Sequence, residues 1–220
     1  MPCGCVLLAY AGLGQLLLSG GPRTVAFDID QWSNESWGLH NIERFHFSGT
    51  AAIASDGSRA NRIQTSHFKH YFFPAGSATV HTIWLKPRNV GYEIDNDQRI
   101  TRQWNCTCTW EDGQAAHDRD ADCSSAAKAQ LGAGATRINS GAIAGVPVTW
   151  YREFHERGED EAAFAPSFAC DVLERRTAKY NRFRLPTFRF HFIVRSYRPG
   201  EPNSTEFMPP QAYKVIERRR

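Results

Sequence analysis

The sequence predicts a mainly β protein built on a single large curved antiparallel sheet, a half-barrel with one or two short helices beside it. About nine segments have the composition and alternation of strands, and short turns join nearly all of them. A flat sheet of this size could not cover its apolar face, so we expect it to curl. The length of 220 residues and the aromatic content of 12% fit one domain with a substantial core.

Three apolar segments, residues 80–85, 90–95 and 100–108, are expected to form consecutive antiparallel strands. Lys86-Pro87-Arg88-Asn89 and Asn96-Asp97-Gln98 separate them. Proline fixes φ, and Asn and Asp accept the backbone conformations of tight turns, so both separators favour reversal of the chain.

Further strands are expected on both sides of this meander. Before it lie residues 44–53, 59–65 and 67–73, with Asp56-Gly57 as the turn of the first hairpin. After it lie residues 136–144, 146–154, 162–177 and 185–197. Residues 120–131 are rich in alanine and are followed by Gly132, which predicts a short helix. Residues 27–41 have no clear period and are interpreted as a lead-in.

The N-terminus has features of a targeting segment. Residues 6–18 are an apolar run followed by Ser19, Gly20 and Gly21, although no Lys or Arg precedes it. We expect residues 1–21 to be a signal peptide and 22–220 to be one domain; the alternative is a buried N-terminal helix. The run is too short to span a bilayer comfortably. The sequons at Asn34, Asn105 and Asn203 also fit a secreted glycoprotein.

The charge pattern does not require a nucleic-acid partner, since the net charge is only +3. One stretch is strongly basic and contains Arg175, Arg176, Lys179, Arg182 and Arg184, with Tyr180 and Phe183 interleaved. We interpret it as a solvated hairpin. A surface for anionic lipid head groups is the alternative.

Catalytic motifs are missing from the sequence, which has no Gly-x-Ser-x-Gly elbow, no phosphate loop and no His-Glu-x-x-His. We therefore expect a protein that is not an enzyme and requires no cofactor. Carboxylates gather at Asp118, Asp120 and Asp122 and again at Glu93, Asp95 and Asp97, so weak calcium binding is a hypothesis. The EF-hand pattern fails, because Cys123 stands where glycine is required.

The order of several short motifs resembles the ependymin-related proteins, whose fold belongs with the LolA-like lipoprotein carriers. The motifs are Ser55-Asp56-Gly57 with Asn61-Arg62-Ile63, Tyr92-Glu93-Ile94-Asp95, Gly145-Val146-Pro147-Val148-Thr149-Trp150, residues 188–194, and Phe207-Met208-Pro209-Pro210. The chain departs from the family at Cys170-Asp171-Val172, where the family has Cys-Pro-Val. It also lacks an early cysteine and one after the Pro-Pro pair.

This resemblance implies a secreted or lysosomal protein, often dimeric and associated with calcium, with a hydrophobic pocket in a curved sheet. Large apolar side chains are available to line such a pocket: Trp84, Tyr92, Ile94, Trp104, Trp150, Phe188, Phe190 and Phe192. The alternative for each is an ordinary packed core. We expect a lipid or other apolar ligand; the alternatives are a calcium-tuned matrix or adhesion protein and, third, a hydrolase with an unrecognised site.

Cleavage after residue 21 would leave four cysteines, Cys106, Cys108, Cys123 and Cys170, in an oxidising compartment. Cys106 and Cys108 face the same way in a strand and cannot easily bond each other. The departures from the family prevent transfer of its disulfide map. Two connectivities remain, and of these we favour Cys108–Cys123 with Cys106–Cys170.

Overall fold

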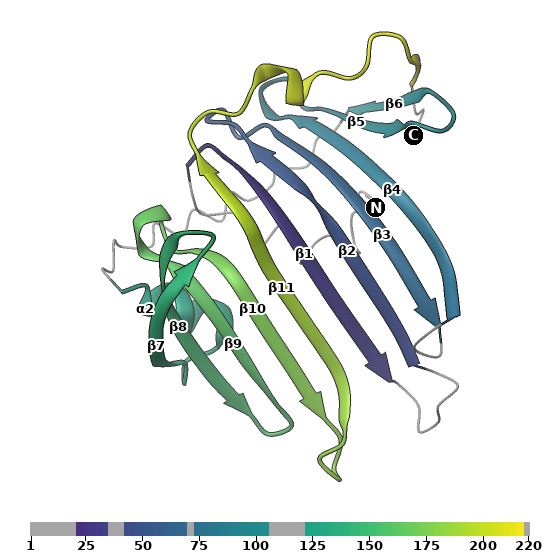
Figure 1. The fold of residues 1–220 in the computed structure, drawn as a ribbon. Coiled ribbons are helices and arrows are strands. Elements are labelled where there is room, and N and C mark those ends of the chain that lie inside the picture. Colours follow the sequence, from purple (N-terminus) through teal and green to yellow (C-terminus); the bar gives the residue numbers. More distant parts are fainter. Residues whose placement is uncertain (1–20, 35–41, 70–72, 106–121, 218–220) are drawn as a thin grey trace.

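A single sheet of twelve strands forms the body of the protein (Figure 1). The computed structural model describes residues 21–34, 42–69, 73–105 and 122–217. The spatial order of the strands is β12-β6-β5-β4-β3-β2-β1-β11-β10-β9-β8-β7. Neighbours are antiparallel except for β12, which runs parallel to β6. The predicted fold class, a large curved antiparallel sheet with little helix, is confirmed.

The bounds of the elements follow the printed sequence closely. The strands are β1 (Arg23–Asn34), β2 (Ile42–Ile53), β3 (Arg59–Lys69), β4 (Phe73–Leu85), β5 (Val90–Asp95), β6 (Ile100–Asn105), β7 (Thr136–Ile143), β8 (Val146–His155), β9 (Gly158–Ala165), β10 (Asp171–Tyr180), β11 (Pro186–Pro199) and β12 (Lys214–Glu217). The helix α2 (Ser124–Leu131) lies between β6 and β7 in the chain. Single turns of 3₁₀ helix occur at Lys86–Arg88, Pro166–Phe168 and Ser204–Phe207.

The sheet consists of two meanders that are joined at β1 and β11. Strands β1 to β6 pair in chain order, and so do β7 to β11. The pairing of Val25 with Tyr197 and of Ile29 with Phe192 connects the two meanders across most of the chain length. Interpreting residues 27–41 as a lead-in was therefore wrong for residues 27–34, which belong to this central strand. Val25, Phe27 and Ile29 are buried at period two, which the two tryptophans and the polar context obscured.

Two other expected segments have different limits in the structure. The expected strands at 59–65 and 67–73 are mainly one strand, β3, and residue 73 begins β4. The expected run at 162–177 is a hairpin, because the chain reverses after Pro166 through Ala169 and Cys170, whose φ angles are 52° and 61°. The short helix, the Asp56-Gly57 hairpin and the turn at Gly145 are confirmed.

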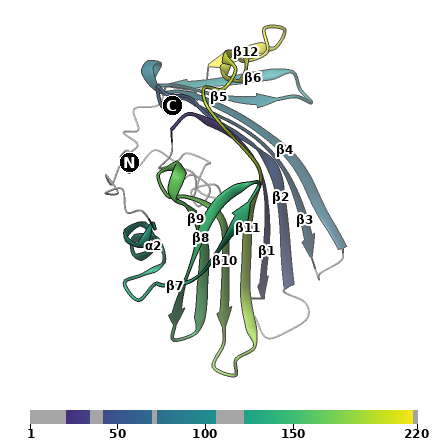
Figure 2. The same cartoon turned by 60° about the vertical axis from the view of Figure 1, so that its left-hand side comes forward.

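The sheet bends around the side on which α2 lies (Figure 2). We call this side the concave face and the opposite side the convex face. Ala126, Ala127 and Leu131 of α2 belong to the same apolar cluster as Tyr151 and Phe164 of the sheet. The Tyr151 hydroxyl also donates a hydrogen bond of 2.8 Å to the carbonyl of Asp122, just before the helix. The helix thus covers one end of the concave face, over β8 and β9.

A disulfide joins Cys123, at the start of α2, to Cys170, at the start of β10. Both cysteines are buried. The expected pairs Cys108–Cys123 and Cys106–Cys170 are therefore wrong, because the fold of the sheet brings the start of β10 beside the helix. Cys106 and Cys108 lie outside the described residues, as do the expected signal peptide up to residue 20, His70, Asp118 and Asp120.

A buried ion pair lies where the two meanders meet. The Nε of Arg23 on β1 lies 2.8 Å from Oδ2 of Asp171 on β10, and Nη2 donates to Oδ1 at 3.1 Å. The hydroxyl of Tyr197 on β11 donates to Asp171 Oδ2 at 2.9 Å. Both charged side chains are essentially inaccessible to water. Burial and the Asp171 carboxylate raise the pKa of Tyr197, so the phenol stays protonated as a donor.

The disulfide generates the first prediction. Replacing both Cys123 and Cys170 with serine should lower the free energy of unfolding by about 4 kcal/mol, because the bridge closes a 47-residue separation in the unfolded chain. Urea unfolding would measure the loss. Peptide mapping without reduction should recover a peptide containing Cys123 linked to Cys170; a peptide linking Cys170 to Cys106 would contradict the structure.

The ion pair generates the second prediction. Asp171→Asn should lower the free energy of unfolding by about 3–5 kcal/mol, because it leaves the Arg23 guanidinium buried without a counter-charge. Asp28→Asn is the matched control, since Asp28 pairs with the exposed Arg195 on the same sheet and should cost less than about 1 kcal/mol. Equal losses for the two variants in urea unfolding would disprove the special role of the buried pair.

Candidate ligand-binding site

Cross-strand register aligns apolar side chains in rows on the concave face. One row lies deeper in the sheet and consists of Phe192, Ile29, Phe47, Thr65 and Ala78. The next row lies nearer the ends of the β1, β2 and β11 strands and consists of Phe190, Gln31, Phe45, His67 and Gly76. Phe192 and Ile29 are buried, whereas Phe47, Phe45 and Phe190 are half-buried. The apolar face is thus well covered at one end and open at the other.

Aromatic rings pack closely in the open part of this face. The Phe45 ring stacks on the His67 imidazole with centroids 4.3 Å apart, and it lies 6.1 Å from the Phe47 ring. Next to them, residues 73–79 of β4 are exposed and carry mostly small side chains, with Gly76 and Ala78 in the same two rows. An aromatic wall therefore borders a low floor, which leaves room beside Phe45 for atoms of a ligand.

The eight residues expected to line a pocket do not share one face. Strand alternation and register place Trp84, Trp104, Phe188, Phe190 and Phe192 on the concave face. Tyr92, Ile94 and Trp150 lie on the convex face, so a single pocket lined by all eight is excluded. Sequence spacing within each strand was correct, but register between strands decides which alternate set meets which.

Trp84 and Trp104 lie far along the sheet from Phe188 and Phe190, and they flank Gly91 across three strands. A Cβ at Gly91 would lie 2.3 Å from Cε2 of Trp104, so the indole rests directly on the backbone of β5. Trp104 therefore covers a glycine and strengthens strand pairing there. Gly49 has a related role in the curvature, because a Cβ there would lie 2.3 Å from the carbonyl oxygen of Arg62 on β3.

Tyr92 and Ile94 belong to a second, smaller core on the convex face. Ile94 packs with Ala52, Ala60 and Ile83, all of which are buried. Tyr92 and the C-terminal residues Phe207 and Tyr213 pack against this cluster. The segment after β11 therefore covers one end of the convex face, and Tyr92 and Ile94 are packing residues.

A polar groove of about 630 Å³ lies on the convex face, away from that C-terminal cover. Its charged lining residues are Asp30, Arg44, Arg152, Glu159, Glu161, Arg176, Arg189 and His191, and Trp32, Gln31, Thr177, Ala178 and Phe190 complete it. The guanidinium of Arg176 lies over the Trp150 ring, 5.1 Å from its centroid. This lining is unlike that of an apolar-ligand pocket, in which few polar groups interrupt an apolar wall.

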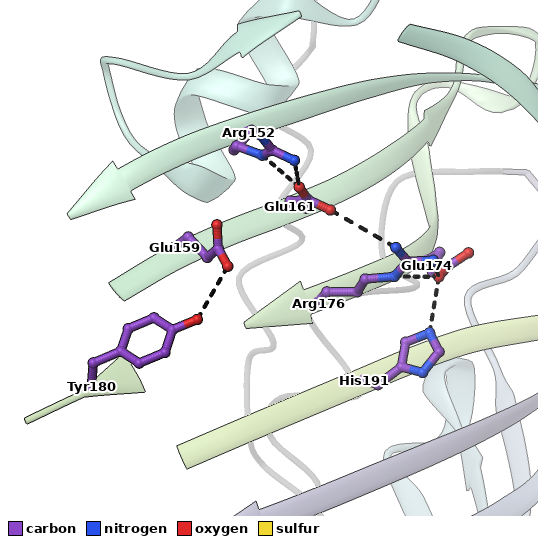
Figure 3. A network of polar contacts seen from close by, with 7 residues as sticks. All are labelled: Arg152, Glu159, Glu161, Glu174, Arg176, Tyr180 and His191. Carbon is purple, nitrogen blue, oxygen red and sulfur yellow. Dashed lines mark hydrogen bonds and ion pairs between the residues drawn. The ribbon is translucent and has the colours of Figure 1, made fainter. Parts of the chain in front are cut away.

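Ion pairs extend across the floor of this groove from β8 to β11 (Figure 3). Arg152 binds Glu161, and Glu161 lies 4.0 Å from Arg176. Arg176 Nε donates to Oε1 of Glu174 at 2.8 Å, and the Nε2 of His191 lies 2.9 Å from the same oxygen. The side chain of Glu174 is 5% exposed, so it holds both partners with little screening by water.

Asp30 forms the corresponding pair on the other side of the groove. Burial by itself raises the pKa of its carboxyl, but hydrogen bonds from Arg44 at 3.0 Å and with His46 at 3.3 Å outweigh it. The pKa therefore lies below its ordinary value, and the carboxylate is charged at neutral pH.

The sequence reasoning missed the charged residues of this groove as a group, including Arg152, Glu161, Glu174 and His191. A usable indication was present, because charged side chains recur at period two in strands whose other face is apolar. Which acidic strand lies beside which basic strand depends on the sheet order, and a single sequence does not reveal it.

The calcium and glycosylation hypotheses remain predictions. Arg102 lies 3.3 Å from Glu93 and 3.4 Å from Asp95, so a cation already neutralises these two carboxylates. Among the described residues there is no group of three or more potential metal ligands. Asn203 is exposed, and its side chain accepts a hydrogen bond from the Thr205 amide within its own sequon. Asn105 is exposed at the end of β6, and Asn34 is half-buried at the end of β1.

Similarities to solved structures are weak and concern the whole chain. The crystal structure of MucB is 13% identical with a TM-score of 0.40, over 94% of this chain and 66% of that chain. The MucA/MucB complex from Pseudomonas aeruginosa is 11% identical with a TM-score of 0.38, over 89% and 58%. A putative outer membrane lipoprotein-sorting protein domain from Vibrio parahaemolyticus is 7% identical with a TM-score of 0.22, over 91% and 95%.

The chain thus spans less than two thirds of the MucB chains, and these scores are too low for any argument about function. No family model matches the sequence, and no curated protein matches it either. The resemblance to ependymin-related proteins has no support from these comparisons. The class that the structure itself defines is an open, curved antiparallel sheet with an apolar concave face and a charged convex groove.

The network in the groove generates the third prediction. Glu174→Gln should lower the free energy of unfolding by about 1–3 kcal/mol, because it removes the buried charge shared by Arg176 and His191. Glu156→Gln is the control, since the Glu156 side chain is 89% exposed and should show no measurable change in urea unfolding. Identical melting behaviour of the two variants would show that the network contributes nothing to stability.

Proposed function

We propose that this protein acts outside the cytoplasm by binding a lipid or another apolar molecule on the open part of its concave face. The observation that supports this most directly is the row of half-buried aromatic rings beside small, exposed residues of β4. Rings of this kind are normally covered in a monomer, and an acyl chain is a cover of suitable shape.

The contacts of the rings define where a ligand would lie. Phe45 and Phe47 on β2 form the centre, with Phe190 on β11 on one side and His67 on β3 on the other. Gln31 separates Phe190 from Phe45 and adds a polar group to the otherwise apolar wall. A few placed polar groups within an apolar surface are typical of sites that orient amphiphilic ligands.

The extracytoplasmic setting is proposed from the chemistry of the cysteines. Buried disulfides such as Cys123–Cys170 persist in oxidising compartments and are rare in the cytosol. Within the described ranges, no helix has the length and apolar character needed to cross a bilayer. We propose a binding protein and not an enzyme, with glycosylation and homodimer formation as further expectations.

The fourth prediction tests the concave-face site. Protein purified without detergent should release an apolar molecule on organic extraction, detected by mass spectrometry. Phe45→Ser should reduce its retention about tenfold, because a large half-buried aromatic surface is lost from the site. Phe68→Ser is the matched control: Phe68 is also half-buried on β3, but its pairing with Arg44 places it on the convex face.

Two outcomes would reject the proposal. One is an extract without apolar molecules together with no binding of a fluorescent fatty acid. The other is equal retention by the Phe45 and Phe68 variants. A protein interface on the concave face, as in a matrix or adhesion protein, would then be the better explanation of the exposed rings.

A further inference from the structure

The hairpin between β10 and β11 ends in a loop that carries two exposed apolar side chains. Phe183 is 56% exposed and Leu185 is 54% exposed. Both belong to the turn between Tyr180 and Pro186, at the end of the sheet opposite the C-terminal segment (Figure 1). Neither ring nor aliphatic chain contributes to the cores described above. Large apolar groups at a protruding tip commonly mark an interaction surface.

Cations surround these apolar side chains. Lys179, Arg182 and Arg184 are exposed, and the guanidinium of Arg182 lies 4.7 Å from the centroid of the Phe183 ring. From residue 175 to residue 198 the chain has eight Lys and Arg and neither Asp nor Glu. The tip therefore carries positive charge on the same loop as its apolar groups.

The loop is held in one shape by its own hydrogen bonds. Oδ1 of Asn181 accepts from the amides of Phe183 at 2.8 Å and Leu185 at 3.0 Å. The amide of Asn181 donates to the carbonyl of Leu185 at 2.9 Å, and the amide of Arg184 donates to the carbonyl of Asn181 at 2.9 Å. A loop that is ordered before it binds loses little conformational entropy on binding.

The neighbouring hairpin between β8 and β9 ends at the same side of the sheet (Figures 1 and 2). The amide of Tyr180 donates to the carbonyl of Arg157 at 2.8 Å, which ties the two tips together. Phe154, near that tip, is 68% exposed. The acidic groups here are Glu156, 3.9 Å from Arg157, and Glu159, which accepts from the Tyr180 hydroxyl. Positive charge still exceeds negative charge at this end.

We propose that this end of the sheet docks on the surface of a membrane that contains anionic lipids, with Phe183 and Leu185 inserted between the head groups. Lys179, Arg182 and Arg184 would pair with the lipid phosphates around the inserted side chains. Apolar insertion and electrostatic attraction act together in such binding, and neither is strong alone. A protein partner would not explain the uniform positive charge without an acidic surface of its own.

The fifth prediction tests this surface by flotation of the full chain with lipid vesicles. Binding is expected to vesicles of phosphatidylcholine with phosphatidylglycerol, to weaken as salt screens the charges, and to be much weaker with phosphatidylcholine alone. Arg182→Gln with Arg184→Gln should weaken binding to the anionic vesicles about thirtyfold. Phe183→Ser with Leu185→Ser should weaken it by about tenfold or more.

Matched controls lie at the other end of the molecule. Met208→Ser removes an equally exposed apolar side chain, and Lys214→Gln removes an exposed cation. Both should bind vesicles as the unaltered protein does. The proposal is overturned if the unaltered protein does not distinguish the two kinds of vesicle, if the tip variants bind as tightly as the unaltered protein, or if the controls lose binding equally.

Unchanged thermal unfolding of the tip variants is expected, because the replaced side chains are exposed, and it would show that lost binding is not lost folding. The inference goes beyond the concave-face ligand and does not depend on it. An empty organic extract with intact vesicle binding would reject the ligand alone. Retained ligand without vesicle binding would reject the docking surface alone.

Discussion

The pairing of β1 with β11, with the Arg23–Asp171 ion pair buried beside it, is the constraint on which the remaining structure depends. Each meander pairs its strands in chain order, and only this contact joins the two halves into one curved sheet. Arg23, Asp171 and Tyr197 come from three adjacent strands, so their contacts are formed only when all three strands are in register. The residue before Asp171 is the disulfide cysteine Cys170, which also brings α2 to this junction.

A buried ion pair of this kind is weak evidence for net stability, since desolvation of two charges offsets much of their attraction. Its larger effect is on specificity. A shift of β1 by one residue along β11 would bury Asp28 and Asp30 in place of Phe27 and Ile29, and it would also separate Arg23 from Asp171. The apolar pattern and the ion pair therefore select the same register.

Joining the meanders gives the two faces different chemistry. On the concave side, Phe190, Gln31, Phe45 and His67 come from four strands and meet in a single row only because β11 lies beside β1. On the convex side, the same pairing brings Arg189 and His191 of β11 next to Trp32 and Asp30 of β1. The apolar surface and the charged groove are thus consequences of one contact between distant parts of the chain.

The membrane-docking tip differs from both surfaces because it is local. Its apolar side chains, its cations and the Asn181 hydrogen bonds all lie within a few residues of one another. The basic stretch with interleaved aromatic residues was accordingly visible in the sequence, as was its hairpin form. Its exposure and its position beside the β8–β9 tip required the folded arrangement.

The sequence by itself determined the fold class, most strands, the short helix and the turns at Asp56-Gly57 and Gly145, because alternation and turn propensity act over a few residues. Tertiary structure decided that residues 23–34 form the central strand, that Cys123 pairs with Cys170, and that Tyr92, Ile94 and Trp150 face away from Phe190. Each of these depends on strand order and register between distant segments. Those are set by the total free energy of competing pairings, to which no single segment contributes a recognisable pattern.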